Sequence, residues 1–92
     1  VLIGSFIVPN APHQTLYWLG EFDGKTFSSQ TQPEKLGFGP DDYAAVSFNN
    51  APDGRRVIMG WMNSWAYAAK TPTENEGFRG AMTLPRELSI RE

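Results

Sequence analysis

The sequence predicts an all-β fold, an antiparallel meander of short strands. Short apolar or alternating segments recur along the 92 residues, and turn-forming residues separate them. Two Asp-Gly pairs, Asp23-Gly24 and Asp53-Gly54, lie between such segments and supply the positive φ angles of a type I′ hairpin. Apolar residues nowhere follow the 3.6-residue helical period for three turns.

Seven strands are expected, at residues 2–8, 16–22, 25–28, 43–49, 55–62, 80–84 and 87–90. The first and fifth are almost continuously apolar, which is typical of strands covered on both faces, as in a propeller or a sandwich. Residues 8–13 are expected to form a loop because two prolines there cannot donate to a ladder. Residues 70–77 are polar and predict an exposed excursion.

Composition excludes several classes of function. Ten acidic and eight basic residues give a net charge of −2, so neither nucleic acid nor a membrane surface is an expected partner. The chain has no Cys and one His, which excludes a disulfide scaffold, a thiolate metal site and a two-His metal site built from this chain alone. We expect no cofactor, no metal, and no transmembrane segment.

The two ends favour a piece of a larger domain over a small complete β domain, which is the alternative. Val1 lies inside an apolar run, and residues 87–92 alternate polar and apolar as a strand does before the sequence stops.

Three titratable side chains are candidates for chemistry. His13, flanked by proline, is interpreted as a solvated loop side chain rather than a catalyst. Asp41 and Asp42 are interpreted as turn or strand-start residues held by local backbone hydrogen bonds, with a substrate contact by Asp42 as the alternative. Neighbouring side chains in a strand point to opposite faces, so the two carboxylates are not expected to face one substrate.

Three aromatic rings fall within residues 61–67. Alternation places Trp61 and Asn63 on one face of the strand, and Trp61 is interpreted as core. Trp65 falls where the chain leaves the sheet, and a ring there, beside Asn and Ser, suits either packing or a sugar site. In a sugar site the ring stacks on C–H faces while amide and hydroxyl groups bond the sugar hydroxyls.

Four motifs in collinear order resemble glycoside hydrolase family 32, the β-fructofuranosidases, which include invertases, levanases and exo-inulinases. Together they span nearly all of the chain: Tyr17-Trp18-Leu19-Gly20-Glu21-Phe22-Asp23-Gly24-Lys25-Thr26-Phe27, Asp42-Tyr43-Ala44-Ala45, Arg55-Arg56-Val57-Ile58-Met59-Gly60-Trp61-Met62-Asn63 and Gly80-Ala81-Met82-Thr83-Leu84-Pro85-Arg86-Glu87-Leu88.

The resemblance implies about two blades of a five-bladed β-propeller, with residues 1–32 in one partial blade and residues 42–92 in the next. It also implies that the catalytic carboxylates lie outside this chain. The family carries them in Trp-Met-Asn-Asp-Pro-Asn-Gly, Arg-Asp-Pro and Glu-Cys motifs, whereas here Trp61-Met62-Asn63 is followed by Ser64.

Carried over by position, the resemblance implies that the Trp65 indole lines a fructose pocket. It places Asp42, Tyr43 and Asn63 near the substrate. Arg86 is expected to be structural, bonding backbone or a carboxylate to close the propeller, and Trp61 is also assigned to structure.

The expected function is therefore part of a retaining β-fructofuranosidase that acts on sucrose, inulin or levan, with the isolated 92 residues inactive. One alternative is a non-catalytic carbohydrate-binding module that uses Trp61, Trp65 and Tyr67. Another is a structural fragment that self-associates or joins the remaining blades through exposed strand edges. Localisation is left open, with an extracellular parent favoured over a cytoplasmic one.

Overall fold

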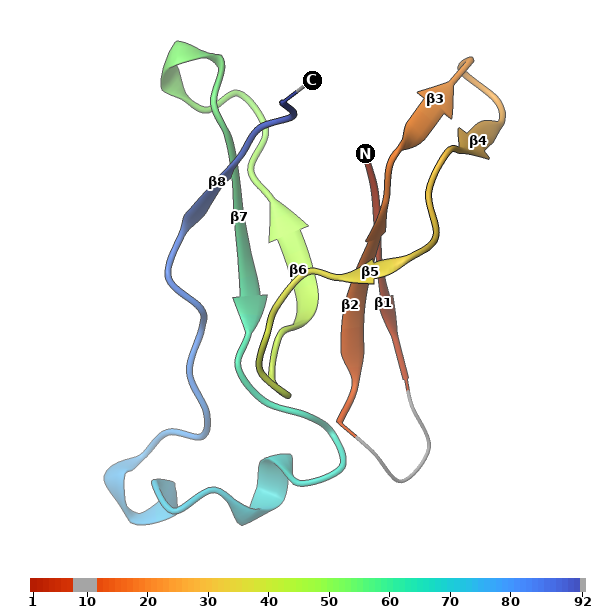
Figure 1. Ribbon diagram of the computed structural model, residues 1–92. Helices are drawn as coiled ribbons and strands as arrows, with labels where there is room; N and C mark the ends of the chain where they lie inside the picture. The colour runs from red at the N-terminus through yellow and green to blue at the C-terminus, as the bar shows by residue number, and fades with distance from the viewer. Residues whose placement is uncertain (8–11, 92) are drawn as a thin grey trace.

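A computed structural model describes residues 1–7 and 12–91, and it is all-β, as predicted (Figure 1). Eight strands form three antiparallel sheets, and the described residues contain three short 3-10 helices but no α-helix. None of the helices in those residues is long and apolar enough to cross a membrane. The elements are β1 (Leu2–Phe6), β2 (Gln14–Trp18), β3 (Gly20–Phe22), β4 (Phe27–Ser29), β5 (Glu34–Lys35), β6 (Tyr43–Ser47), η1 (Pro52–Gly54), β7 (Arg56–Trp61), η2 (Ala68–Lys70), η3 (Glu74–Glu76) and β8 (Arg86–Leu88).

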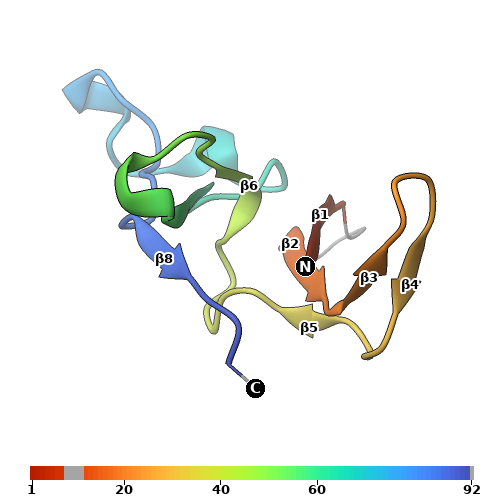
Figure 2. The ribbon, with the colours of Figure 1, turned by 90° about the horizontal axis from the view of Figure 1, so that it is seen from above.

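The first sheet has the strand order β1-β2-β5, and β3 and β4 form a separate hairpin beside it. In Figure 2 the hairpin lies on the side of β1 and β2 that faces away from β8. The strand expected at residues 16–22 is therefore wrong, because it divides at Leu19. The Leu19 backbone bonds to the segment after β4, with Leu19 O accepting from Gln30 N at 2.8 Å and Leu19 N donating to Thr31 Oγ1 at 3.1 Å.

The third sheet has the order β6-β7-β8 and holds the best-buried hydrophobic side chain of the described residues, Ile58, at 1% exposure. The strand expected at residues 80–84 is reduced to one antiparallel bridge between Met82 and Trp61, with backbone hydrogen bonds from Met62 N to Ala81 O at 2.7 Å and from Thr83 N to Gly60 O at 2.8 Å. The Thr83 hydroxyl, rather than a backbone carbonyl, accepts from Gly60 N at 2.9 Å. A side chain in place of a ladder acceptor, followed by Pro85 without an N–H, ends regular pairing there. Pairing resumes at Arg86, so β8 begins one residue before the strand expected at 87–90.

The two Asp-Gly turns differ. Asp53 and Gly54 both have positive φ, 63° and 67°, which confirms the angles expected for type I′. At the other turn only Gly24 is positive, at 97°, so type I′ is wrong there. Asp23 Oδ1 instead accepts from Lys25 N at 2.8 Å and from Thr26 N at 2.7 Å, which closes a four-residue loop between Phe22 and Phe27.

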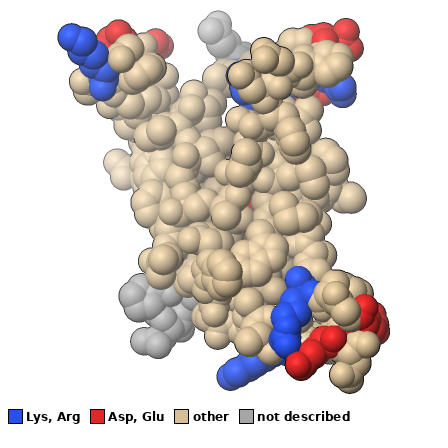
Figure 3. All heavy atoms as spheres, turned by 180° about the vertical axis from the view of Figure 1, so that it is seen from behind, with Lys and Arg blue, Asp and Glu red and all other residues tan. Residues whose placement is uncertain are grey.

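The two strands that were expected to be covered on both faces, β1 and β7, differ in how exposed their side chains are. β7 alternates between half-buried and buried positions, but β1 is open, with Leu2 45% and Phe6 42% exposed. The expectation is wrong for β1, because the residues that the structure describes leave both ends of this strand exposed. The excursion at 70–77 is exposed in the main, as predicted, and its charged side chains form the lower cluster in Figure 3. Residues 8–11 of the expected first loop lie outside the described residues.

We predict that the β3–β4 hairpin loses stability as the pH falls. The two backbone N–H groups that Asp23 accepts from, Thr26 first and then Lys25, hold the pKa of the Asp23 carboxyl below its usual value. Because the pKa is lower in the folded state, this contribution is present above the pKa of the unfolded chain and is lost as the pH drops through the folded value.

Hydrogen exchange of the hairpin amides in the full-length protein measures this. Protection at residues 20–29 should decline in the wild type as the pH falls below about 4, the ordinary pKa of an Asp carboxyl, and this decline should be absent in Asp23→Ala. Identical pH profiles for the two proteins would contradict the assignment.

Candidate functional site

Two consecutive carboxylates at the start of β6 point to different partners that are distant in the sequence. Tyr67 Oη donates to Asp41 Oδ1, and Arg86 Nη2 donates to Asp42 Oδ2 at 2.5 Å. The expectation that local backbone hydrogen bonds hold these residues is therefore wrong. The sequence shows two turn-forming aspartates, but their partners lie 26 and 44 residues away and carry no local signal.

Arg86 joins three segments of the chain. Besides the ion pair with Asp42, its Nη1 donates to the backbone carbonyl of Leu36 at 3.3 Å. Leu36 N in turn donates to Thr15 O at 2.9 Å, and Gln14 forms a parallel bridge with Asp42. These contacts connect β8 to the residues before β6 and to β2, so the two three-stranded sheets meet at this ion pair. The guanidinium thus bonds both backbone and a carboxylate.

Glycines make the room that the buried Asp42 side chain occupies. Asp42 is 8% exposed, and its Oδ1 has no partner among the described residues. A Cβ built on Gly60 would lie 2.0 Å from Oδ1, and one on Gly37 would lie 2.9 Å from Oδ2. The sequence does not predict this role for either glycine, because the approach of the Asp42 side chain to their backbone depends on the folded structure.

Four rings follow one another from the start of β2 to the loop after β7. The ring centroids of His13 and Tyr43 are 5.0 Å apart, those of Tyr43 and Trp61 are 6.5 Å apart, and those of Trp61 and Trp65 are 5.0 Å apart. His13 is only 6% exposed, so its interpretation as a solvated side chain is wrong: the ring packs edge-on against Tyr43. Trp61 is half-buried within the row rather than fully enclosed.

The Trp65 indole is exposed, whereas the two polar residues that precede it in the loop are buried. Trp65 is 69% exposed, whereas Asn63 is 2% and Ser64 0% exposed. Asn63 Oδ1 accepts from Ser64 N at 2.8 Å, and Ser64 Oγ accepts from Ala66 N at 3.2 Å. The loop therefore satisfies its own backbone and presents one large ring outward.

The three rings of the binding-module alternative do not form a flat platform. The planes of Trp61 and Trp65 are inclined by 59°, and the hydroxyl of Tyr67 is directed to Asp41. Gly80, with φ of 74°, passes close to this loop, and a Cβ there would lie 2.7 Å from Asn63 Nδ2 and 3.2 Å from Trp61 Nε1.

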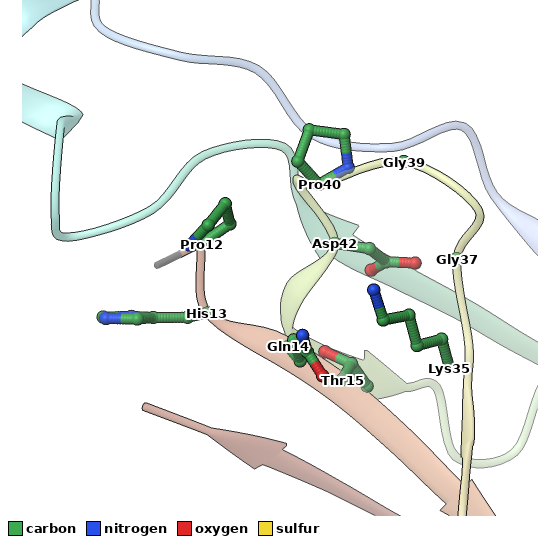
Figure 4. Close-up of a pocket in the computed structure, with 9 residues that line it drawn as sticks. All are labelled: Pro12, His13, Gln14, Thr15, Lys35, Gly37, Gly39, Pro40 and Asp42. Atoms are coloured by element: carbon green, nitrogen blue, oxygen red, sulfur yellow. The ribbon is translucent and has the colours of Figure 1, made fainter. Parts of the chain in front are cut away.

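A cavity of about 120 Å³ lies beside the ion pair (Figure 4). The Lys35 side chain extends toward Asp42 across it, while the His13 ring points away from the other lining side chains. Within the described part of the chain, no three His, Cys, Asp or Glu side chains gather in a way that could hold a metal ion. The lining is Pro12, His13, Gln14, Thr15, Lys35, Gly37, Gly39, Pro40 and Asp42.

Comparison with known proteins gives consistent matches over most of the chain. The model of a family described as "Glycosyl hydrolases family 32 N-terminal domain" matches residues 1–92. A levanbiose-producing levanase of Bacillus subtilis (strain 168) is 41% identical over 86 residues, which cover 88% of this chain and 17% of that protein. A levanase of the same organism is 41% identical over 80 residues, covering 82% and 12%.

An extracellular exo-inulinase of Aspergillus niger (strain ATCC MYA-4892 / CBS 513.88 / FGSC A1513) is 36% identical over 103 residues, covering 98% of this chain and 19% of that protein. The chain therefore spans less than one fifth of the length of these three relatives.

Removing the Arg86 guanidinium should destabilise the protein more than removing that of Arg79. The two arginine side chains are similarly exposed, at 38% and 40%, but the carboxylate of Asp42 is 9% exposed and that of Glu74 67%. Arg86→Ala leaves the Asp42 carboxylate buried without its charged partner, which we expect to cost about 2–4 kcal/mol of unfolding free energy. The matched control is Arg79→Ala: Arg79 pairs with Glu74 at 2.9 Å, with side-chain exposures of 40% and 67%. Its loss should cost less than about 1 kcal/mol.

Chemical denaturation of the full-length variants measures both values. Equal losses for the two variants would contradict the role of the Asp42–Arg86 pair as the junction of the sheets.

Proposed function

The chain belongs to glycosyl hydrolase family 32, and we propose on this basis that it is part of an enzyme that releases fructose from fructans. In this proposal the whole protein hydrolyses terminal β-D-fructosyl bonds of levan, inulin or sucrose with retention of configuration. Relatives named levanase and exo-inulinase support a fructan as the substrate. The proposed partner is therefore a fructose-containing oligo- or polysaccharide, and no cofactor is invoked.

The exposed Trp65 indole is the observation that carries this proposal. The ring stays 69% exposed although its neighbours Asn63 and Ser64 are buried, so its face is free to meet a ligand. The flat apolar face of an indole suits the C–H face of a sugar ring. We propose that Trp65 forms one wall of a fructose pocket, and that half-buried Tyr43 lies at its edge.

Asp42 and Asn63 are the other proposed substrate residues. Both side chains are buried, so in the proposal they orient neighbouring residues. Asp42 Oδ1 and Asn63 Nδ2 have no hydrogen-bond partner among the described residues, and these two atoms are available to a ligand or a water that reaches them. Trp61 and Arg86 remain structural in this account.

The catalytic acid and nucleophile are assigned to parts of the protein outside this chain. Retaining hydrolysis requires two carboxyl groups about 5–5.5 Å apart that can reach the same glycosidic bond. The two neighbouring carboxylates of the site are each committed to another side chain, Asp41 to Tyr67 and Asp42 to Arg86. We accordingly propose that residues 1–92 supply pocket wall and scaffold, and that they have no turnover alone.

We further propose that these residues form about two blades of a five-bladed propeller, with residues 1–32 in one and 42–92 in the next. The two three-stranded antiparallel sheets support this division, although β5, at Glu34–Lys35, pairs with the first of them. Open apolar side chains on β1, Leu2 and Phe6, are then covered by the remainder of the enzyme.

Replacing Trp65 tests the pocket. In the full-length protein, Trp65→Ala should lower kcat/KM for fructose release from levan and inulin about 5- to 30-fold, because stacking worth about 1–2 kcal/mol is lost. Trp65→Phe should retain part of the stacking energy and therefore lower kcat/KM less than Trp65→Ala does. The control is Phe78→Ala, since Phe78 is also an exposed ring, at 53%, and lies on the excursion side of the chain.

Absence of fructose release from levan, inulin and sucrose by the wild-type protein would overturn the proposed function. Unchanged kinetics in Trp65→Ala would leave the function standing and remove Trp65 from the pocket.

A further inference from the structure

We propose that Asp41 and Tyr67 are positioning residues, a tether that fixes the orientation of the Trp65 indole. The inference rests on the proposed function, in which Trp65 contacts the sugar. The observation that leads to it is the hydrogen bond from the Tyr67 hydroxyl to Asp41 Oδ1, which connects the loop carrying Trp65 to the start of β6 across 26 residues of sequence.

Trp65 has little packing of its own to hold it in place. The ring is 69% exposed, and its recorded aromatic neighbour is Trp61, at 5.0 Å and inclined by 59°. An exposed side chain with free rotamers must be ordered when a ligand binds, and this ordering weakens binding. A loop that holds the ring beforehand avoids that cost.

The loop is closed on both sides of Trp65. Ser64, the preceding residue, is fully buried, and its carbonyl accepts from Tyr67 N at 3.1 Å, so residues 64–67 form one turn. Tyr67 ends that turn, and its hydroxyl is bound by Asp41. Fixing the side chain of Tyr67 therefore fixes the turn that presents the Trp65 ring.

The anchor at the other end of the tether is itself rigid. Asp41 is followed by Asp42, which is buried and paired with Arg86, and Arg86 also binds the carbonyl of Leu36. A hydrogen bond between a phenol and a carboxylate is stronger than one between neutral groups, which suits a single contact that holds a loop. The neighbouring carboxylates thus hold different segments: Asp42 holds β8, and Asp41 holds the Trp65 loop.

Tyr67→Phe in the full-length protein tests this by removing one oxygen atom. The matched control is Tyr17→Phe, because the Tyr17 hydroxyl also donates to a distant carboxylate, Glu34 Oε2, at 2.8 Å, but far from Trp65 in the first sheet. For Tyr67→Phe we expect KM for levan and inulin to rise about 3- to 10-fold with kcat changed less than twofold, because a wall that binds ground and transition states alike is loosened. Tyr17→Phe should change neither.

Three further measurements separate positioning from general stability. The exciton couplet of the Trp61–Trp65 pair is measured as the difference between the far-ultraviolet circular dichroism spectra of the wild type and Trp65→Ala. Tyr67→Phe should weaken this couplet. In the Trp65→Ala background, Tyr67→Phe should have no additional effect on KM, since the tether then holds no ring. Asp41→Asn, whose amide oxygen can still accept, should keep most of the function that Asp41→Ala loses.

An unchanged couplet in Tyr67→Phe, or an equal rise in KM with and without Trp65, would overturn the proposal. If Tyr67→Phe fails to fold, Asp41→Ala against Asp41→Asn makes the same comparison. If the wild type releases no fructose, the proposed function fails, and the couplet by itself still decides whether the tether orients Trp65.

Discussion

The rest of this structure depends on the side-chain contacts of Asp41 and Asp42, the two residues just before β6. Two aspartates there face different ways, and each binds a segment that is far away in the sequence: Asp41 takes the hydroxyl of Tyr67 and Asp42 takes the guanidinium of Arg86. The two aspartates directly precede β6, and their side chains reach segments 26 and 44 residues further along the chain. The sheet β6-β7-β8 and the loop after β7 are thereby tied to the same point.

The Asp42–Arg86 pair carries the larger energetic consequence. A buried carboxylate needs its partner, and here the partner also reaches the carbonyl of Leu36, next to β5 of the other sheet. Glycines at 37 and 60 provide the space around the carboxylate. The core of the 92 residues is otherwise thin, with Ile58 the one hydrophobic side chain recorded as buried among the described residues. The ion pair and the packing of the His13 ring against Tyr43 both join the two sheets.

Sequence patterns captured the parts of the fold that depend on near neighbours. Alternation and turn residues located β1, β6 and β7, and Asp53-Gly54 adopts the positive φ angles expected of it. They failed where distant contacts decide the outcome. Leu19 ends a strand because residues 30 and 31 bond its backbone, and residues 80–84 keep a single bridge to β7 because the Thr83 hydroxyl replaces a carbonyl.

The candidate site shows the same division. The place of Trp65 in the loop after β7 could be predicted from the apolar strand before it, and the bonds of Arg86 to backbone and a carboxylate from the resemblance of its motif. The burial of His13 against Tyr43 could not, because a proline-flanked loop gives no sign of what packs over it. The sequence indicated that Asp41 and Asp42 point in different directions, but it gave no sign that the partner of Asp41 is Tyr67.

A crystal structure of the full-length protein with fructose bound tests the central claim most directly. The account predicts that the sugar ring lies against the Trp65 indole while the hydrogen bond between Asp41 and Tyr67 and the ion pair between Asp42 and Arg86 are both formed. Fructose bound away from Trp65, or bound against it with the Tyr67 hydroxyl released from Asp41, would contradict the account.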